Sequence, residues 1–164
     1  MRKKRLAKLG RFCFRGFVFC LLLTAYCSLS FAAWTRQRSG TMAWLHAVSF
    51  LDQHHGWVAG SNGTLLETTD GGQTWTKAHP PTGDTLRDVY FANDHDGWLV
   101  CERDVSKSKT NDEPRSYLLK TNDGGVSWQR IVPDGVEANA KLVRAVFTGS
   151  ERGWAFGEGG VALV

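Results

Sequence analysis

Five histidine and aspartate residues gather in two short polar stretches and have the side-chain types that bind metal ions. They are His54, His55, Asp94, His95 and Asp96. Zinc sites use cysteine, histidine and carboxylate ligands at recurring spacings, and neither stretch has such a spacing. Both stretches instead have the composition of tight turns, which favour small polar residues. We therefore predict turns here, no metal site and no cofactor.

Two carboxylates recur in one motif and have the chemistry of general acids or bases. Asp70 lies in TTDGGQTW and Asp123 in TNDGGVSW, and both sequences match the Asp-box pattern (S/T)-x-D-x-G-x-(S/T)-W. An aspartate in a turn accepts hydrogen bonds from nearby backbone N–H groups, and glycine supplies the positive φ that such a turn needs. The tryptophan buries a large ring beside the hairpin. We predict no catalytic residue, and a structural role for Asp70, Gly72, Trp75, Asp123, Gly125 and Trp128.

These motifs recur because the chain repeats itself. Residues 45–78, 86–131 and 143–164 align, and each segment contains a Gly-Trp pair. Short apolar runs are separated by glycine, asparagine and aspartate, as strands joined by tight turns require. Four antiparallel strands in a repeat of roughly 40 to 45 residues predict a β-propeller blade. The expected fold class is all-β, with about two and a half four-stranded blades of a truncated propeller.

The second repeat is longer than the first. The stretch from Trp98 to Asp123 is almost twice as long as the corresponding stretch from Trp57 to Asp70, so an insertion is placed at residues 102–116. The fourth strand of each complete repeat is predicted over residues 74–76 and 127–129.

One basic residue falls near the start of the first strand of each repeat. His46, Arg87 and Arg144 are assigned to one aligned position. Strands alternate in direction, so this position and the insertion share one end of the blades. Arginine binds carboxylates through bidentate hydrogen bonds, which favours an acidic protein partner. The alternative is that these arginines are merely solvated, since isolated surface charges contribute little, and His46 interrupts the pattern.

Charge is distributed unevenly along the chain. The formal net charge is +4, yet the segment from Met1 to Arg15 contains seven bases and no acid. The rest of the chain holds 13 bases and 16 acids. A folded body without a basic excess argues against a nucleic-acid partner.

An apolar run at residues 17–33 follows the basic start. A basic start, an apolar middle and a small-residue end predict a secretory signal peptide. The alternative is an uncleaved membrane anchor, for which about 17 apolar residues are the lower limit. Both alternatives place residues 34–164, the predicted propeller, outside the cytoplasm. A hydrophobic helix is expected within residues 1–33.

The motifs L-x-x-V-x-F, GW-x-x-G and G-x-L-L-x-T-x-DGG-x-TW together resemble the photosystem II stability and assembly factor family, a branch of the Asp-box propellers. The resemblance covers residues 45–164. It implies an exported, non-catalytic propeller without a cofactor, in a periplasm or a thylakoid lumen, which binds protein partners through an arginine patch. We therefore expect a scaffold for a membrane-protein assembly intermediate or an envelope protein, with Arg87, Arg144 and His46 at the binding surface.

A fragment of an Asp-box glycoside hydrolase is the alternative. Resemblance to sialidases implies an arginine triad, a tyrosine nucleophile with a glutamate partner, and an aspartate acid. The body offers only Tyr90 and Tyr117, and two arginines rather than three at the aligned position.

The third repeat stops inside its third strand, and an open arc of blades leaves strand edges bare. We therefore expect the N-terminal piece of a longer protein, or a truncated reading frame, rather than a self-assembled ring, because partial blades do not mate symmetrically.

Overall fold

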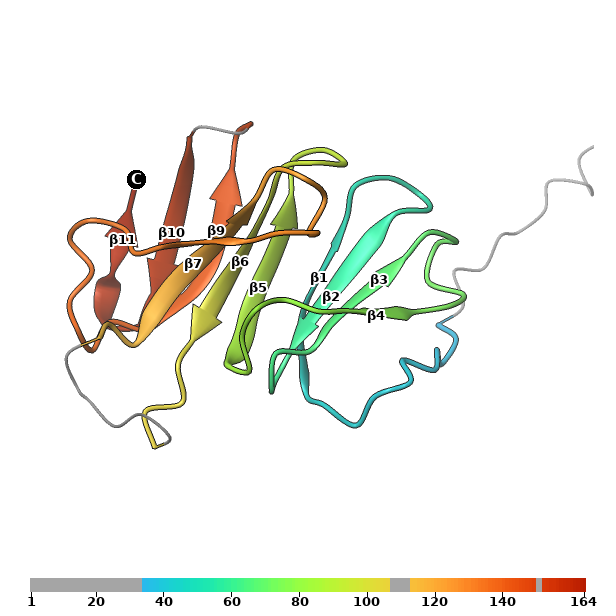
Figure 1. The fold of residues 1–164 in the computed structure, drawn as a ribbon, viewed down its shortest axis with the longest axis horizontal. Coiled ribbons are helices and arrows are strands. Elements are labelled where there is room, and N and C mark those ends of the chain that lie inside the picture. Colours follow the sequence, from blue (N-terminus) through green and yellow to red (C-terminus); the bar gives the residue numbers. More distant parts are fainter. Residues whose placement is uncertain (1–33, 107–112, 150–151) are drawn as a thin grey trace, which may run out of the picture. The chain divides into compact units, whose positions relative to one another are not determined.

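The apolar runs form strands that are bounded by glycine-rich and aspartate-rich turns, and these strands make three antiparallel sheets (Figure 1). The structure is a computed structural model that describes residues 34–106, 113–149 and 152–164. The first sheet contains β1 (Leu45–Phe50), β2 (Gly56–Gly60), β3 (Leu65–Thr68) and β4 (Thr76–Ala78). The second contains β5 (Thr85–Phe91), β6 (Gly97–Glu102), β7 (Ser116–Thr121) and β8 (Gln129–Ile131). The third contains β9 (Leu142–Phe147), β10 (Gly153–Gly157) and β11 (Ala162–Leu163), with a 3₁₀ turn at Glu158–Gly160.

Within each sheet the spatial order of the strands follows the chain order. The first strands of neighbouring sheets are in contact, β1 with β5 and β5 with β9, and Figure 1 shows the three sheets side by side. This is the arrangement of successive propeller blades. The all-β prediction of four-stranded antiparallel blades is confirmed, with two complete blades and a third of three strands.

The predicted fourth strands were placed two positions too early. β4 begins at Thr76 and β8 at Gln129, so Trp75 and Trp128 lie before the strands. The reason is the Asp-box turn, in which the Thr74 N–H donates to the Asp70 carboxylate at 2.9 Å. An N–H group that is committed to the turn cannot also join the strand ladder.

Aromatic rings join each blade to the next. Trp57 of β2 stacks on Phe91 of β5, with ring centroids 3.8 Å apart. Trp98 of β6 stacks in the same way on Phe147 of β9, at 4.1 Å. In both complete blades the Gly-Trp tryptophan therefore packs against the first-strand phenylalanine of the following blade. Burial of these rings and the leucines around them supplies the main favourable term that holds the blades together.

Residues Gln37–Val164 form one compact unit. Within the described part of the chain, no helix has the length and apolar character needed to span a bilayer. The leader and helix predicted for residues 1–33 lie outside the described residues.

Candidate functional site

A groove of about 610 Å³ opens at the first strands of all three blades. Its wall contains the three basic residues that the sequence singled out, His46, Arg87 and Arg144. The rest of the lining is mostly apolar: Leu45, Ala47, Val48, Val58, Asp88 and Val143. The fold thus brings together one basic residue from each repeat, beside apolar side chains that an extended peptide could cover.

The sequence predicted that the three basic residues share one aligned position, and this prediction is wrong. Each first strand has a β-bulge near its start, and the bulged residue is His46 in β1, Arg87 in β5 and Val143 in β9. Arg144 follows the bulge and corresponds to Asp88. The spacing to the next Gly-Trp tryptophan carries this signal, since it is the same for His46 and Arg87 but one position shorter for Arg144.

Asp88 links the second blade to the third and is a residue that sequence reasoning missed. Its carboxylate accepts a hydrogen bond from the buried Ala145 N–H of β9 at 2.9 Å. Arg144 Nε lies 3.9 Å from the same carboxylate, yet the Arg144 side chain is 74% exposed. Burial raises the pKa of Asp88, and the hydrogen bonds from backbone N–H groups and the charge of Arg144 oppose this only in part. Arg144 is therefore only loosely paired and has donors available to a ligand.

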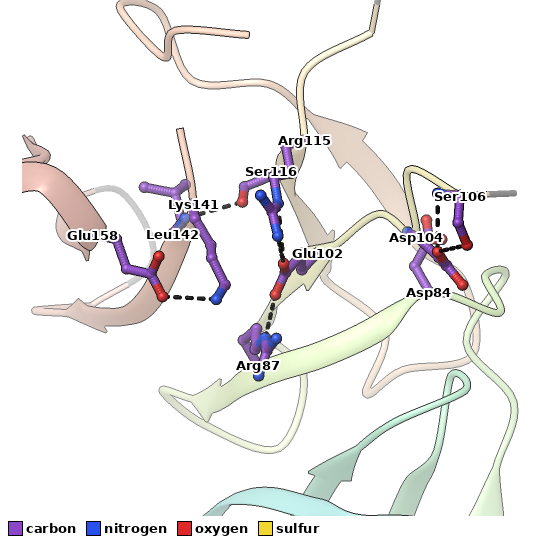
Figure 2. A network of polar contacts seen from close by, with 10 residues as sticks. All are labelled: Asp84, Arg87, Glu102, Asp104, Ser106, Arg115, Ser116, Lys141, Leu142 and Glu158. Atoms are coloured by element: carbon purple, nitrogen blue, oxygen red, sulfur yellow. Dashed lines mark hydrogen bonds and ion pairs between the residues drawn. The ribbon is translucent and has the colours of Figure 1, made fainter. Parts of the chain in front are cut away.

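Glu102 holds the other arginine of the groove (Figure 2). Its carboxylate is only 7% exposed and pairs with Arg87 through one oxygen and with Arg115 through the other, the latter at 2.7 Å. Burial alone would raise the pKa of Glu102, but the hydrogen bonds from Arg115 and Arg87 outweigh burial and lower it. Arg115 lies at the end of the insertion, so Glu102 ties the insertion to the groove, as the shared end of the blades predicted.

Further polar contacts attach the end of the insertion to the connection between β8 and β9 and to the start of β9. The Arg115 N–H donates to the Ala138 carbonyl at 2.8 Å, and Ser116 Oγ accepts from the Leu142 N–H at 3.0 Å. The central residues of the insertion, 107–112, lie outside the described residues. Arg87 keeps a 29% exposed side chain despite its pair with Glu102, and an arginine has five N–H donors in all.

His46 adds little positive charge to the groove at neutral pH. Burial and the nearby positive charge of Arg87 lower its pKa, against a smaller opposing effect of Glu102. The groove therefore carries two arginine cations near neutral pH and gains a third cation in acid.

The aspartate carboxylates of the two Asp-boxes have the same hydrogen-bond partners. The Asp70 carboxylate accepts hydrogen bonds from the Thr74 hydroxyl at 2.5 Å, from the Thr74 N–H at 2.9 Å and from the Thr68 hydroxyl at 2.8 Å. Asp123 does the same with Ser127 and Thr121. These contacts occupy both carboxylate oxygens of each aspartate within its own turn.

The glycines and tryptophans of the boxes complete these turns. Gly72 and Gly125 have φ values of 86° and 90°, in the left-handed region. Trp128 Nε1 donates to the Gly125 carbonyl at 3.0 Å, and the Trp75 ring lies edge-on to Phe50, with centroids 6.2 Å apart. The boxes thus connect the last strand of a blade to the first strand of the same blade.

The Asp-boxes are expected to make stability depend on pH. Hydrogen bonds from Thr74, first from its hydroxyl, lower the pKa of Asp70 to about 2, and Ser127 does the same for Asp123. A carboxylate whose folded pKa is below its unfolded value stabilises the fold above the unfolded pKa, and this contribution is lost as pH falls through the folded pKa. The urea midpoint should therefore fall between pH 4 and pH 2.

The matched variant replaces both carboxylates. Asp70→Asn with Asp123→Asn should flatten this part of the pH profile, whereas Asp134→Asn, an exposed aspartate outside the boxes, should leave it as in the wild-type protein. A double variant with the full wild-type drop would contradict the assignment.

The two tyrosines that were weighed for a hydrolase site have structural partners instead. Tyr90 donates to the Phe147 carbonyl at 2.8 Å, and Tyr117 to the Asp84 carboxylate at 2.7 Å. Burial raises the pKa of Tyr117 and raises that of the Cys101 thiol to about 12. In the part of the chain that the structure describes, no group of three histidine, cysteine or acidic side chains is placed to hold a metal ion.

The blades with their paired Asp-boxes define a partial Asp-box β-propeller. Residues 27–81 match the family model described as "Photosynthesis system II assembly factor YCF48". This match confirms the resemblance to photosystem II assembly factor-like repeats that the sequence shows, over the part of the chain that it covers.

Individual relatives are similar to this chain over parts of their length. "Photosystem II assembly protein Ycf48" of Thermosynechococcus vestitus is 48% identical over 48 residues, which are 29% of this chain and 14% of the relative. "Photosystem II stability/assembly factor HCF136, chloroplastic" of Oryza sativa subsp. japonica is 29% identical over 105 residues, 61% of this chain and 22% of the relative. The solved structure "YCF48 bound to D1 peptide" is 29% identical with a TM-score of 0.63, and the match covers 82% of this chain and 41% of that one. The chain thus spans less than half of these relatives.

Proposed function

We propose that this chain is a non-catalytic scaffold outside the cytoplasm that binds an acidic segment of a protein partner in the groove of His46, Arg87 and Arg144. The observation that carries the proposal is the convergence of two arginines, from different blades, on one groove with apolar walls. The solved relative described as bound to D1 peptide supports a peptide as the ligand. By analogy, the partner is a protein of a photosystem II assembly intermediate.

The charge balance of the groove favours carboxylates. Asp88 is engaged by the Ala145 N–H, and Glu102 is shared between Arg87 and Arg115. Both acids are buried, whereas Arg144 is largely exposed and Arg87 partly so. An incoming carboxylate would therefore meet guanidinium donors first, and charge-assisted hydrogen bonds of this kind are stronger than neutral ones. The exposed valines of the groove would receive apolar side chains beside the acidic group.

Removing both arginines should weaken binding. Arg87→Ala with Arg144→Ala is expected to lower the affinity for a D1-derived peptide at least about tenfold, since hydrogen bonds to charged groups are worth ~1.5–3 kcal/mol. Titration calorimetry at fixed ionic strength measures the change, and the loss should shrink as salt is raised.

Lys77→Ala with Arg152→Ala is the matched control. It removes the same charge from exposed positions that do not line the groove, so its affinity should equal that of the wild-type protein. The proposal is refuted if the groove variant binds as tightly as this control.

A further inference from the structure

A buried carboxylate beside the groove holds two arginines, and only one of them lines the groove. Arg115 donates to one oxygen of Glu102 from Nε at 3.1 Å and from Nη2 at 2.7 Å, and Arg87 donates to the other oxygen (Figure 2). One negative charge thus faces two positive charges. Lys141 is near enough to help lower the pKa of Glu102, but it pairs with Glu158 at 2.7 Å. Among the described residues neither arginine has a second acidic partner, so the cluster keeps an excess of positive charge.

The first blade makes the corresponding turn without any charge. By the strand register, Ser61 of the first blade corresponds to Glu102. Ser61 Oγ accepts a hydrogen bond from the Trp44 N–H at 3.0 Å, and the Ser61 N–H donates to the Trp44 carbonyl at 2.8 Å. A short Asn62-Gly63 turn stands where the second blade has its insertion. A buried ion pair is weak evidence for stability, because desolvation offsets the attraction between the charges. A blade therefore folds without this cluster, and the excess charge is available for a ligand.

The backbone of Arg115 is held on both sides, so its side chain has a defined position. The Arg115 N–H donates to the Ala138 carbonyl, and the Arg103 N–H donates to the Arg115 carbonyl, both at 2.8 Å. Glu102 fixes the guanidinium through Nε and Nη2. Nη1 has no hydrogen bond within the part of the chain that the structure describes, and the side chain is 36% exposed. Arg115 therefore presents preorganised donors to the solvent, and preorganisation lowers the cost of binding.

We propose that Arg115 is a specificity-determining residue of the groove and binds a second acidic group of the peptide, beside the one that meets Arg87 and Arg144. This role rests on the proposed function and defines the class of ligand as a segment with two acidic residues close together. Arg87 and Arg115 contact the two oxygens of one carboxylate, so their guanidinium groups lie near each other. Glu102 is the positioning residue that holds both of them.

The spacing of the two acidic residues follows from the geometry of an extended peptide. Alternate side chains of such a peptide share one face and lie about 7 Å apart. Neighbouring side chains point to opposite faces, so two adjacent acidic residues could not both meet the arginines. The two acidic residues of the ligand should therefore occupy alternate positions, with an apolar residue between them.

Two acetylated and amidated heptapeptides that differ in one charge test this role on the full chain. The first is Ala-Val-Asp-Val-Asn-Val-Ala, with one acidic residue, and the second has aspartate in place of asparagine. Titration calorimetry at fixed ionic strength measures both affinities. The wild-type protein should bind the diacidic peptide at least about fivefold more tightly, a modest gain because the charges are partly solvated.

Arg115→Gln should abolish this preference. Glutamine keeps an amide donor for the buried carboxylate but has no charge for the second acidic residue. The peptide with one acidic residue should keep its wild-type affinity, because it meets Arg87 and Arg144, whereas a purely structural role of Arg115 would weaken both peptides equally. Lys141→Gln is the matched control, since it removes a nearby cation that is already paired, and the preference should persist.

The role of Arg115 is overturned if the wild-type protein binds both peptides equally, or if Arg115→Gln keeps the full preference. It is also overturned if Lys141→Gln loses as much of the preference, because the second acidic residue would then sense only the general charge of this face. The peptide with one acidic residue tests the proposed function separately. If the wild-type protein binds it without preferring the diacidic peptide, the groove stands and only the role of Arg115 fails. If neither peptide binds, both fail.

Discussion

Trp98→Ala is expected to lower the free energy of unfolding by about 3–5 kcal/mol, the usual cost of truncating a buried aromatic side chain. Trp98 is only 4% exposed and belongs to β6. Its ring stacks on Phe147 of the third blade at 4.1 Å and lies beside Tyr90. The variant would therefore leave a cavity at the contact that joins the second blade to the third.

Denaturant unfolding, followed by far-UV circular dichroism, measures this loss. Trp44→Ala removes the same side chain from an exposed position, and surface substitutions usually change stability by less than about 0.5 kcal/mol. If the two variants have equal midpoints, the blades are not held together by the tryptophan stack. Trp57→Ala should resemble Trp98→Ala, because Trp57 makes the corresponding contact with Phe91.

Gly63→Ala is expected to destabilise the protein by more than about 2 kcal/mol, since a left-handed backbone alone costs an alanine ~1–2 kcal/mol. Gly63 has a φ of 63° in the turn between β2 and β3. A Cβ atom there would lie 2.1 Å from the Thr82 carbonyl oxygen, which is backbone and cannot rotate away. The Gly63 N–H also donates to the Asp84 carbonyl at 2.7 Å, so the clash would disturb the connection between the first two blades.

Gly83→Ala is the matched control for this change. Gly83 is close in space to Gly63, but a Cβ atom there would meet nothing within 4 Å. Its urea midpoint should therefore stay near that of the wild-type protein or rise slightly, because alanine restricts the unfolded chain more than glycine does. Equal losses in both variants would show that the close approach at Gly63 does not matter.

The sequence alone determined the repeats and most of the strands. Alternating apolar residues between glycine-rich and aspartate-rich turns have a local cause, because a strand exposes alternate side chains to opposite faces. The Gly-Trp pairs and the Asp-boxes are local as well, since the hydrogen bonds of Asp70 reach only from Thr68 to Thr74. Such features can be predicted without knowing what lies across the sheet.

The groove could be predicted only in part. His46, Arg87 and Arg144 were correctly placed near the starts of the first strands, but the bulges at His46, Arg87 and Val143 were not foreseen. A bulge inserts an extra residue into a strand and re-aims the side chains around it. The predicted alignment of the third repeat was shifted by one position, and it therefore put Arg144 where the structure has Val143. The spacing to the Gly-Trp pair was sufficient to show this, because the bulge lies at the same distance in every blade.

Other features depended on contacts between residues far apart in the chain. Asp88 meets the Ala145 N–H across a blade boundary, and Glu102 meets both Arg87 and Arg115 at the base of the insertion. Short-range patterns determine which residues form a strand. Which side chains meet depends on how neighbouring blades pack, because that packing joins segments through tertiary contacts that no local period encodes.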